Sequence, residues 1–253
     1  MQSEEDRLLL NRFAELAGRS NRQNRYLFTG FLSLGEQALF YQSAASFPAA
    51  SYELSGGFAS CERRMVRFGN PQEIGYEEPF PITCLCIRQT APKFAGVLTH
   101  RDYLGALIHL GVERTVLGDI LPAGHLAYVY CQDSMAPFIC ENLTRVKQAA
   151  VEVRPVKEAP DDALPCLKEQ VFAAASERLD VLLCAVWNLS RSQSAEAVKS
   201  GRVFVNGRLC ENSSMQPRIG DLITLRGHGR FVYDGIVCET KKGRYKVSVK
   251  LYQ

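Results

Sequence analysis

One segment in the last third of the chain predicts its local fold in unusual detail. Ser190 is a good helix N-cap, and Gln193 three residues later completes a capping box. Gly201 stands just past the end of the predicted helix, where a left-handed residue can close it. The run Val203-Phe204-Val205 is typical of a strand, and Asn206-Gly207 is a strong signal for a two-residue hairpin turn. The segment therefore predicts a helix, a closing glycine and a β-hairpin, in that order.

A further helix is predicted directly upstream. Arg178-Leu179-Asp180 opens it, and apolar residues follow at helical spacing as far as Val186. Arg191 and Ser192 occupy the first turn of the second helix. The free N–H groups of such a turn point outward and carry the positive end of the helix dipole, so they suit a phosphate group.

This pattern resembles the small RNA-binding domain named after ribosomal small-subunit protein four, called the S-four domain below. Four separate pieces carry the resemblance in the same order, at residues 178–180, 189–192, 201–207 and 220–225. The resemblance implies a domain of two helices, a β-hairpin and further strands. Such a domain is expected to recognise the shape and backbone of folded RNA rather than its base sequence.

At 253 residues the chain is too long for one such module, and two or three domains are expected. We predict an α+β protein with an N-terminal mixed α/β domain, a ferredoxin-like (RNA-recognition-like) middle domain, a linker and an S-four domain, at 1–76, 80–156, 157–173 and 174–253 respectively. Within the first domain, a helix from Glu5 to Leu16 is predicted to end at Gly18, with a basic loop over residues 19–25.

The middle domain shows a regular alternation of elements. Strand, helix, strand, strand, helix and strand are predicted at 82–87, 99–110, 114–121, 125–131, 133–146 and 150–153. This β-α-β-β-α-β order is the ferredoxin-like pattern shared by RNA-recognition domains, which stack bases on outward aromatics of their central strands. Tyr128 and Tyr130 share one face, but the first strand has no aromatic residue. We therefore favour a scaffold or docking role for this sheet over base stacking.

The charge of the chain is unevenly distributed. The net charge is +3, yet the residues from Glu177 onward carry thirteen Lys or Arg against seven Asp or Glu, which is +6 and leaves −3 for the remainder. Basic charge gathered over the S-four pattern is the footprint expected of a module that binds a polyanion. A solvated basic face is the alternative explanation.

Composition also bounds the cellular setting and the chemistry. The nine cysteines include no Cys-x-x-Cys pair, and no histidines have metal-ligand spacing, so we expect reduced thiols without a metal or cofactor. The acidic first residues lead into no signal-like apolar run, and no stretch approaches the ~18 apolar residues of a membrane helix. We expect a cytoplasmic protein, monomeric and without a membrane partner.

Other segments extend the likeness to the whole chain. The most specific are 99–120, which starts Thr99-His100-Arg101-Asp102, and 226–231, which reads Arg-Gly-His-Gly-Arg-Phe. With further pieces at 31–37 and 56–63, the chain resembles the YlmH family of bacterial S-four proteins. The resemblance implies a non-catalytic protein that binds ribosomal RNA, and with it tRNA, on large ribosomal subunits obstructed by peptidyl-tRNA.

Two alternatives stay open. Arg178-Leu179-Asp180 also resembles the Arg-Leu-Asp of pseudouridine synthases, in which the aspartate is the nucleophile of RNA modification. Here Val181-Leu182-Leu183-Cys184 follows in place of Thr-x-Gly-Leu, so we interpret Asp180 as a first-turn residue favoured by the helix dipole. The other alternative is a protein-interaction factor, linked to cell division, that acts through the middle domain.

The predicted RNA-binding surface consists of ten side chains, with no catalytic residue among them. They are Arg178, Ser190, Arg191, Ser192, Gln193, Lys199, Arg202, Arg208, Arg226 and Arg230. Arginine predominates because its planar guanidinium can contact phosphate through two hydrogen bonds. Glu196, one turn before Lys199, offers that lysine an ion-pair partner instead. The basic turn at 241–244 is expected to lie remote from this surface.

Overall fold

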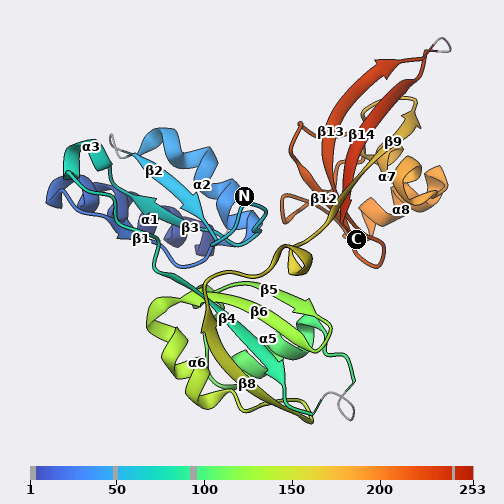
Figure 1. The fold of residues 1–253 in the computed structure, drawn as a ribbon. Coiled ribbons are helices and arrows are strands. Elements are labelled where there is room, and N and C mark those ends of the chain that lie inside the picture. The colour runs from blue at the N-terminus through green and yellow to red at the C-terminus, as the bar shows by residue number, and fades with distance from the viewer. Residues whose placement is uncertain (1–3, 48–50, 92–95, 241–242, 253) are drawn as a thin grey trace. The chain divides into compact units, whose positions relative to one another are not determined.

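In a computed structural model the chain forms two compact units, Met1–Leu164 and Pro165–Gln253. The structure describes residues 4–47, 51–91, 96–240 and 243–252. Figure 1 labels the helices and strands. The first unit contains the predicted N-terminal and middle domains, and the second contains the S-four domain.

The N-terminal domain packs two helices against a small antiparallel sheet of order β1-β3-β2. Its elements are α1 (Glu4–Gln23), β1 (Leu27–Phe28), α2 (Leu34–Ser43), β2 (Tyr52–Ser55), β3 (Met65–Phe68) and α3 (Pro71–Ile74). Ser33 caps α2 in a capping box with Glu36. The core combines Phe13 and Leu16 of α1 with Phe40 of α2 and Phe68 of β3.

The first helix is longer than predicted. It continues through Gly18 to Gln23, so most of the predicted basic loop is helical. Gly18 is buried, and the ion pair from Arg19 Nη1 to Glu15 Oε1 at 3.2 Å spans it on the exposed side. The helix ends instead at Asn24, whose φ of 46° is left-handed. A glycine terminates a helix only where the backbone leaves the helical region.

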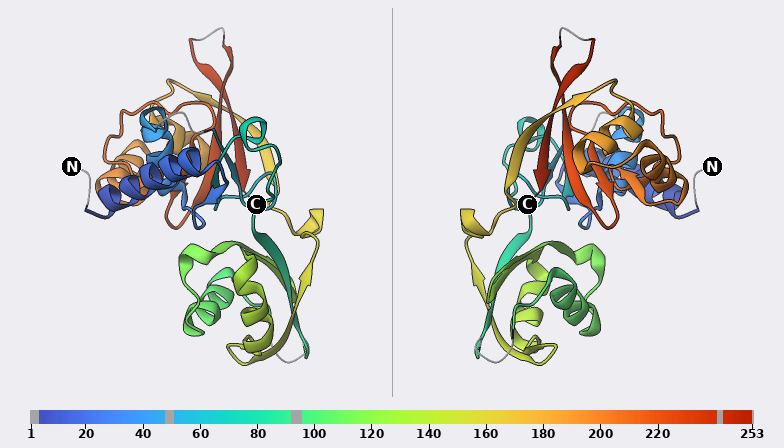
Figure 2. Two further views of the ribbon diagram at one scale, coloured as in Figure 1. Left: turned by 90° about the vertical axis from the view of Figure 1, so that its left-hand side faces the viewer. Right: turned by 90° about the vertical axis from the view of Figure 1, so that its right-hand side faces the viewer.

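The middle domain has the predicted ferredoxin-like fold. Its elements are β4 (Ile82–Gln89), α5 (His100–His109), β5 (Leu117–Ala123), β6 (Leu126–Gln132), α6 (Ala136–Asn142), β7 (Arg145–Val146) and β8 (Ala149–Val156). The strands lie in the order β5-β6-β4-β8-β7, with every pair antiparallel. Both α5 and α6 cover the same face of this sheet (Figure 2). Thr99 caps α5 together with Asp102, as the sequence predicted.

Two boundaries in the middle domain differ from the prediction. Residues 114–116 form a 3-10 turn before β5 begins. The second helix stops at Asn142, and Arg145–Val146 forms the short strand β7 instead of a last helical turn. Val146 is fully buried opposite Ala149 in this hairpin, so tertiary burial determines its conformation.

Hydrogen bonds connect the N-terminal and middle domains within the first unit. The Arg63 guanidinium donates to the carbonyl oxygens of Leu117 at 2.8 Å, Phe31 at 2.8 Å and Arg114 at 2.9 Å. The Asp119 carboxylate accepts from the backbone N–H groups of Glu62 at 2.7 Å and Arg63 at 3.1 Å. Arg63 therefore binds the carbonyls of Leu117 and Arg114 in the middle domain, and Asp119 binds two N–H groups of the N-terminal domain, so the two domains form one unit.

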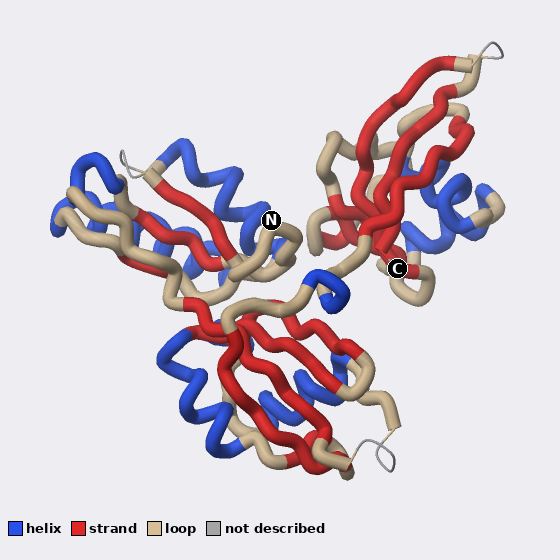
Figure 3. The backbone as a smooth tube through the Cα atoms, in the orientation of Figure 1, coloured by secondary structure: helices blue, strands red, loops and turns tan. Residues whose placement is uncertain are grey.

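The second unit is a six-stranded antiparallel sheet with two helices on one face, as the tube in Figure 3 shows. Its elements are β9 (Leu167–Ala174), α7 (Leu179–Trp187), α8 (Arg191–Lys199), β10 (Val203–Val205), β11 (Arg208–Leu209), β12 (Leu222–Leu225), β13 (Gly229–Glu239) and β14 (Tyr245–Tyr252). The core includes Leu179 and Leu183 of α7, Val198 of α8, and Phe231 and Val249 of the sheet.

The predicted linker at 157–173 is wrong for its last seven residues. Residues 167–174 form β9, which pairs with β14 in eight registered positions from Leu167↔Tyr252 to Ala174↔Tyr245. Ala174 is buried and Phe172 packs against the core of the S-four unit. The pairing partner lies more than 70 residues away in the chain, so no local signal marks this strand. The S-four unit therefore starts before residue 174.

Candidate RNA-binding surface

The start of α8 has the predicted capping geometry. The Ser190 side chain accepts from the Gln193 N–H at 3.2 Å, and the Gln193 side chain accepts from the Ser190 N–H at 2.9 Å. Ser190 and Ser192 also share a hydrogen bond between their hydroxyls at 2.9 Å. The cap engages the Ser190 and Gln193 side chains, so the groups best placed to meet a phosphate are the exposed Arg191 and Ser192.

Arg178 and Asp180 form a pair at the start of α7. The guanidinium donates from Nε to Asp180 Oδ1 at 3.1 Å and from Nη2 to Oδ2 at 2.8 Å. Asp180 raises the pKa of Arg178 through this hydrogen bond and its charge. Asp180 Oδ1 also accepts from the Val181 N–H at 3.0 Å, so the aspartate is the first-turn residue that the sequence predicted. The pair holds the Arg178 guanidinium at the surface, where its side chain is 45% exposed.

The starts of α7 and α8 border a shared hollow of about 220 Å³. Asp180 and Cys184 of α7, Arg191 of α8 and Arg244 before β14 line it, with alanines of residues 173–175. Arg244 was not predicted, and the expectation that the turn at 241–244 is remote is wrong for this residue. Lys241, the residue chosen to represent that turn, lies outside the described residues. Only the pairing of β14 with β9 brings Arg244 here, so local sequence offers no signal for it.

A second group of predicted residues lies around the end of α8. The Arg202 Nε donates to Ser200 Oγ at 3.1 Å, and the Arg202 carbonyl accepts from the Arg226 N–H at 3.0 Å. The Arg226 guanidinium lies over the Phe204 ring, 4.4 Å from its centroid. Lys199 and Arg202 are exposed. About 12 Å of helix axis separates this group from Arg191, so the two groups can contact different phosphates.

The remaining two arginines lie on opposite faces of the sheet. Phe204, Thr224 and Arg230 are paired in register, which places Arg230 on the face opposite the helices. Its guanidinium lies 4.2 Å from the centroid of the Tyr252 ring. Arg208 pairs with Val205, which belongs to the core on the helix side. The structure therefore places the Arg226 and Arg230 guanidinium groups on the face opposite the helices and Arg208 on the helix side.

The sheet of the middle domain has no open aromatic face. Tyr128 and Tyr130 are 8% and 2% exposed, in a cluster with Cys84, Cys86 and Ala159. The Phe58 ring lies 5.0 Å from that of Tyr130, whose hydroxyl accepts from the Ala159 N–H at 3.2 Å. Burial raises the pKa of Tyr130 to about 12. The chain itself covers the face on which related folds stack bases.

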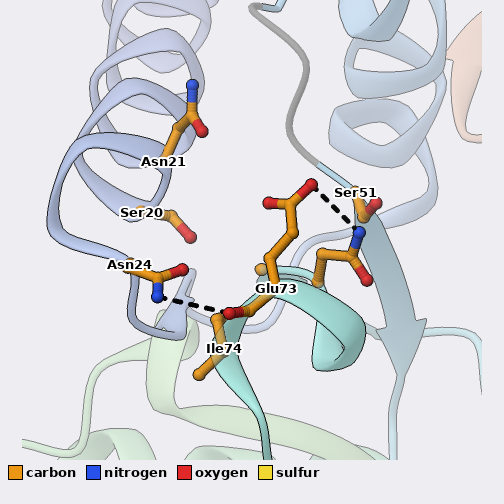
Figure 4. A pocket seen from close by; sticks show the side chains of 8 residues that line it. Ser20, Asn21, Asn24, Ser51, Glu73 and Ile74 are labelled. Carbon is orange, nitrogen blue, oxygen red and sulfur yellow. Dashed lines mark hydrogen bonds between the residues drawn. The ribbon is translucent and has the colours of Figure 1, made fainter.

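A small polar pocket in the N-terminal domain is not a ligand site. Figure 4 shows Ser20, Asn21 and Asn24 of the α1 end facing Glu73 and Ile74. Its volume of about 10 Å³ is close to that of one water-sized probe. Asn24 Nδ2 donates to the Glu73 carbonyl at 3.3 Å, so its polar groups already satisfy one another in part.

Among the described residues, no group of three or more His, Cys, Asp or Glu side chains could hold a metal ion. All nine cysteines are free thiols. No helix in the described part of the chain is long and apolar enough to span a membrane.

Two family models match the middle domain and the S-four unit of this chain. A family model described as "Putative RNA-binding domain in YlmH" matches residues 76–159. A model described as "S4 domain", which is the S-four domain, matches residues 177–223. The ribosome-associated protein quality control protein P2 of Bacillus subtilis (strain 168) is 32% identical over 231 residues, which cover 89% of this chain and 87% of that protein. The solved structure of the cell division protein ylmH from Streptococcus pneumoniae is 20% identical with a TM-score of 0.48, over 62% of this chain and 93% of that one.

Identity at this level over nearly the full length of both proteins, with both domain matches in place, confirms the resemblances inferred from the sequence. The chain belongs to the YlmH family of bacterial, ribosome-associated RNA-binding proteins with an S-four domain.

Proposed function

We propose that this protein binds ribosomal RNA of the large subunit, at particles obstructed by peptidyl-tRNA, and acts there in ribosome-associated quality control without catalysis. The contact is made by the S-four unit through phosphates and RNA shape. The protein acts as a monomer in the cytoplasm, with tRNA as a second RNA partner. The Bacillus subtilis relative, named for ribosome-associated quality control, supports this assignment.

The observation that carries the proposal is the arrangement of cations at both ends of α8. Arg191 and Arg244 border the hollow at its start, and the exposed Lys199 and Arg202 lie at its end. About 12 Å of helix axis lies between Arg191 and Lys199, so the cations at the two ends of α8 can meet two different phosphates of a folded RNA backbone. No base edge needs to be read for such contacts to select a shape.

The charged groups around the first cluster favour binding over RNA modification. In pseudouridine synthases the aspartate must attack the base, whereas both Asp180 oxygens accept hydrogen bonds from Arg178. We therefore expect ribosomal RNA incubated with the protein to keep its uridines unmodified. Formation of a pseudouridine that Asp180→Ala abolishes would establish the enzymatic alternative.

The binding proposal is tested with alanine variants of the full chain and purified large subunits, with and without peptidyl-tRNA, by sedimentation. A lost charge-assisted contact costs about 1.5–3 kcal/mol, so Arg191→Ala and Arg202→Ala should each weaken binding roughly tenfold or more. Each should flatten the log-log salt dependence by about one unit and leave the melting temperature unchanged. Arg244→Ala should behave like Arg191→Ala because the two side chains line one hollow.

Arg218→Ala is the matched control, since Arg218 is an exposed arginine of the same unit outside both clusters. It should change affinity little. Unchanged affinity and salt slope in both Arg191→Ala and Arg202→Ala would move the RNA site away from α8. Equal binding to free and obstructed subunits would contradict the assignment to peptidyl-tRNA particles, and an RNA pull-down that returned nothing would favour the protein-interaction alternative.

A further inference from the structure

A groove on the helical side of the middle domain lies outside the proposed S-four surface. It has a volume of about 550 Å³ and is bordered by α5 on one side and by residues 142–147 on the other. We call it the α5 groove. Its lining combines basic and apolar side chains, among them Arg101, Arg145, Lys147, Ala106, Leu110 and Leu143.

This groove is on the side of the domain that remains accessible. The opposite face of the sheet is occupied by Tyr128 and Tyr130, which Phe58 and the segment 159–164 cover. An RNA contact of the kind made by open RNA-recognition sheets therefore has no surface there. If residues 76–159 bind RNA, as their family model describes, the contact must use another face of the domain.

Lys147 is held at the groove by a backbone conformation that is unusual for lysine. It occupies the turn between β7 and β8 with a φ of 53°, in the left-handed region that favours glycine or asparagine. Its Nζ lies 2.6 Å from Asp102 Oδ1. Asp102 Oδ2 in turn accepts from the Thr99 N–H at 2.8 Å at the start of α5. A cation is thus fixed at one side of the groove by a network that spans both of its walls.

Two arginines add free positive charge to the same groove. Arg101 and Arg145 are exposed, and in the part of the chain that the structure describes neither has an ion-pair partner. Asp102 is the one acidic residue in the lining and it is paired with Lys147. The groove therefore presents two unpaired guanidinium groups, although the unit that contains it carries a net charge of −3.

We propose that the α5 groove is the RNA-binding surface of the middle domain, with Arg101 and Arg145 on backbone phosphates and an unpaired base against the half-buried Ala106 and Leu110. The proposal rests on RNA being the ligand of the protein, and assigns a second site separate from α8. Guanidinium groups beside an apolar lining match a nucleotide, which joins a phosphate to a flat ring. An acidic peptide would satisfy the cations but would leave the apolar lining without a matching group.

Gly105 offers a way to block the groove without changing its charge. It lines the groove, and a Cβ added there meets nothing within 4 Å. Gly105→Leu should therefore fill part of the groove and also favour the helix, because leucine has a higher helix propensity than glycine. The double variant R101A/R145A removes the charge and keeps the space. Arg154→Ala is the matched control, an exposed arginine on β8 of the same domain outside the groove lining.

The full chain is titrated with a fluorescein-labelled single-stranded RNA of mixed sequence at several salt concentrations. We expect R101A/R145A to weaken binding about tenfold or more and to flatten the salt slope by about two units. Gly105→Leu should weaken binding about three- to tenfold with the slope unchanged, since it fills the space for the base but removes no charge. Ultraviolet crosslinks of wild-type protein should map to 101–110 and 142–147, and Arg154→Ala should match the wild type.

The outcomes separate this proposal from the one for α8. Wild-type affinity in both groove variants, with binding lost in Arg191→Ala, overturns the groove and leaves the S-four site intact. Binding lost in the groove variants but kept in Arg191→Ala supports the groove and overturns the α8 site. Unchanged RNA affinity together with loss of binding to a labelled poly-glutamate probe would identify the groove as a peptide site and overturn the proposal.

Discussion

The middle domain and the S-four unit each cover one face of an antiparallel sheet with two helices, but they differ in what lies on the other face. In the middle domain that face is closed by Phe58 and residues 159–164, which bury Tyr128 and Tyr130. In the S-four unit it carries Phe204 and Arg230, with Arg226 over the Phe204 ring. A shared layer architecture therefore does not fix which face of a sheet the rest of the chain covers.

Charge sharpens the contrast between the two units. Residues 165–253 carry fourteen Lys or Arg and eight Asp or Glu, a net charge of +6, whereas residues 1–164 carry −3. The S-four unit can attract RNA by its overall charge. The first unit must gather its cations locally, as the α5 groove does.

The largest effect should come from removing β9. The fragment 165–253 should fold alone, whereas 175–253 should lose more than half of its free energy of unfolding. Loss of β9 removes eight registered residue pairs with β14 and exposes the edge of β14. Far-ultraviolet circular dichroism in a urea titration measures both fragments. Equal midpoints would show that β9 is the dispensable linker predicted from sequence.

The second prediction tests the joint inside the first unit. Asp119→Ala leaves the N–H groups of Glu62 and Arg63 without their acceptor, which should cost about 2–4 kcal/mol. Calorimetry of the full chain should show a lower melting temperature for the first unit and an unchanged melting temperature for the S-four unit. The exposed Glu141→Ala should shift neither transition. If Asp119→Ala shifted neither melting transition, the stability of the first unit would not depend on the Asp119 hydrogen bonds between its two domains.

The third prediction compares two half-buried phenylalanines. Phe58→Ala should lower the stability of the first unit by about 2 kcal/mol, because its ring packs on Tyr130, and leave RNA affinity unchanged. Phe204→Ala should cost less stability but weaken RNA binding about threefold or more, because Arg226 loses the ring that positions it. Melting curves and RNA titrations of both variants measure these opposite effects. Tighter RNA binding by Phe58→Ala would show that the covered tyrosines are a latent binding face.

The smallest effect concerns pH. The hydrogen bond from Lys147 and that from the Thr99 backbone lower the pKa of Asp102 to about 2. Because this pKa is below that of the unfolded chain, the pair stabilises the first unit above about pH 4, and this contribution is lost as pH falls toward 2. Asp102→Asn should therefore lower the melting temperature slightly at pH 7 and converge with the wild type at low pH. A difference that stayed constant with pH would show that the carboxylate charge is irrelevant.

Much of the local structure could be read from sequence, because neighbouring residues determine it. Ser190 and Gln193 form their capping box, and Asn206 and Gly207 both have positive φ in the hairpin turn. The order of strands and helices in 80–156 was enough to predict the ferredoxin-like topology, because right-handed connections between strands leave few alternative topologies. Seven of the ten predicted site residues lie at the two ends of α8 or in the β12–β13 turn, yet two of them, Ser190 and Gln193, are engaged in the cap.

Only the tertiary structure decided what depends on partners far away in the chain. Residues 167–174 became a strand because β14 offers an edge, and that pairing brings Arg244 beside Arg191. Tyr130 was closed off by Phe58, more than 70 residues before it, and the α5 groove formed between segments about 40 residues apart. Capping and turn preferences act over a few residues and are written in the local sequence. Burial and strand pairing depend on which surfaces meet, and that is settled only when the whole chain has folded.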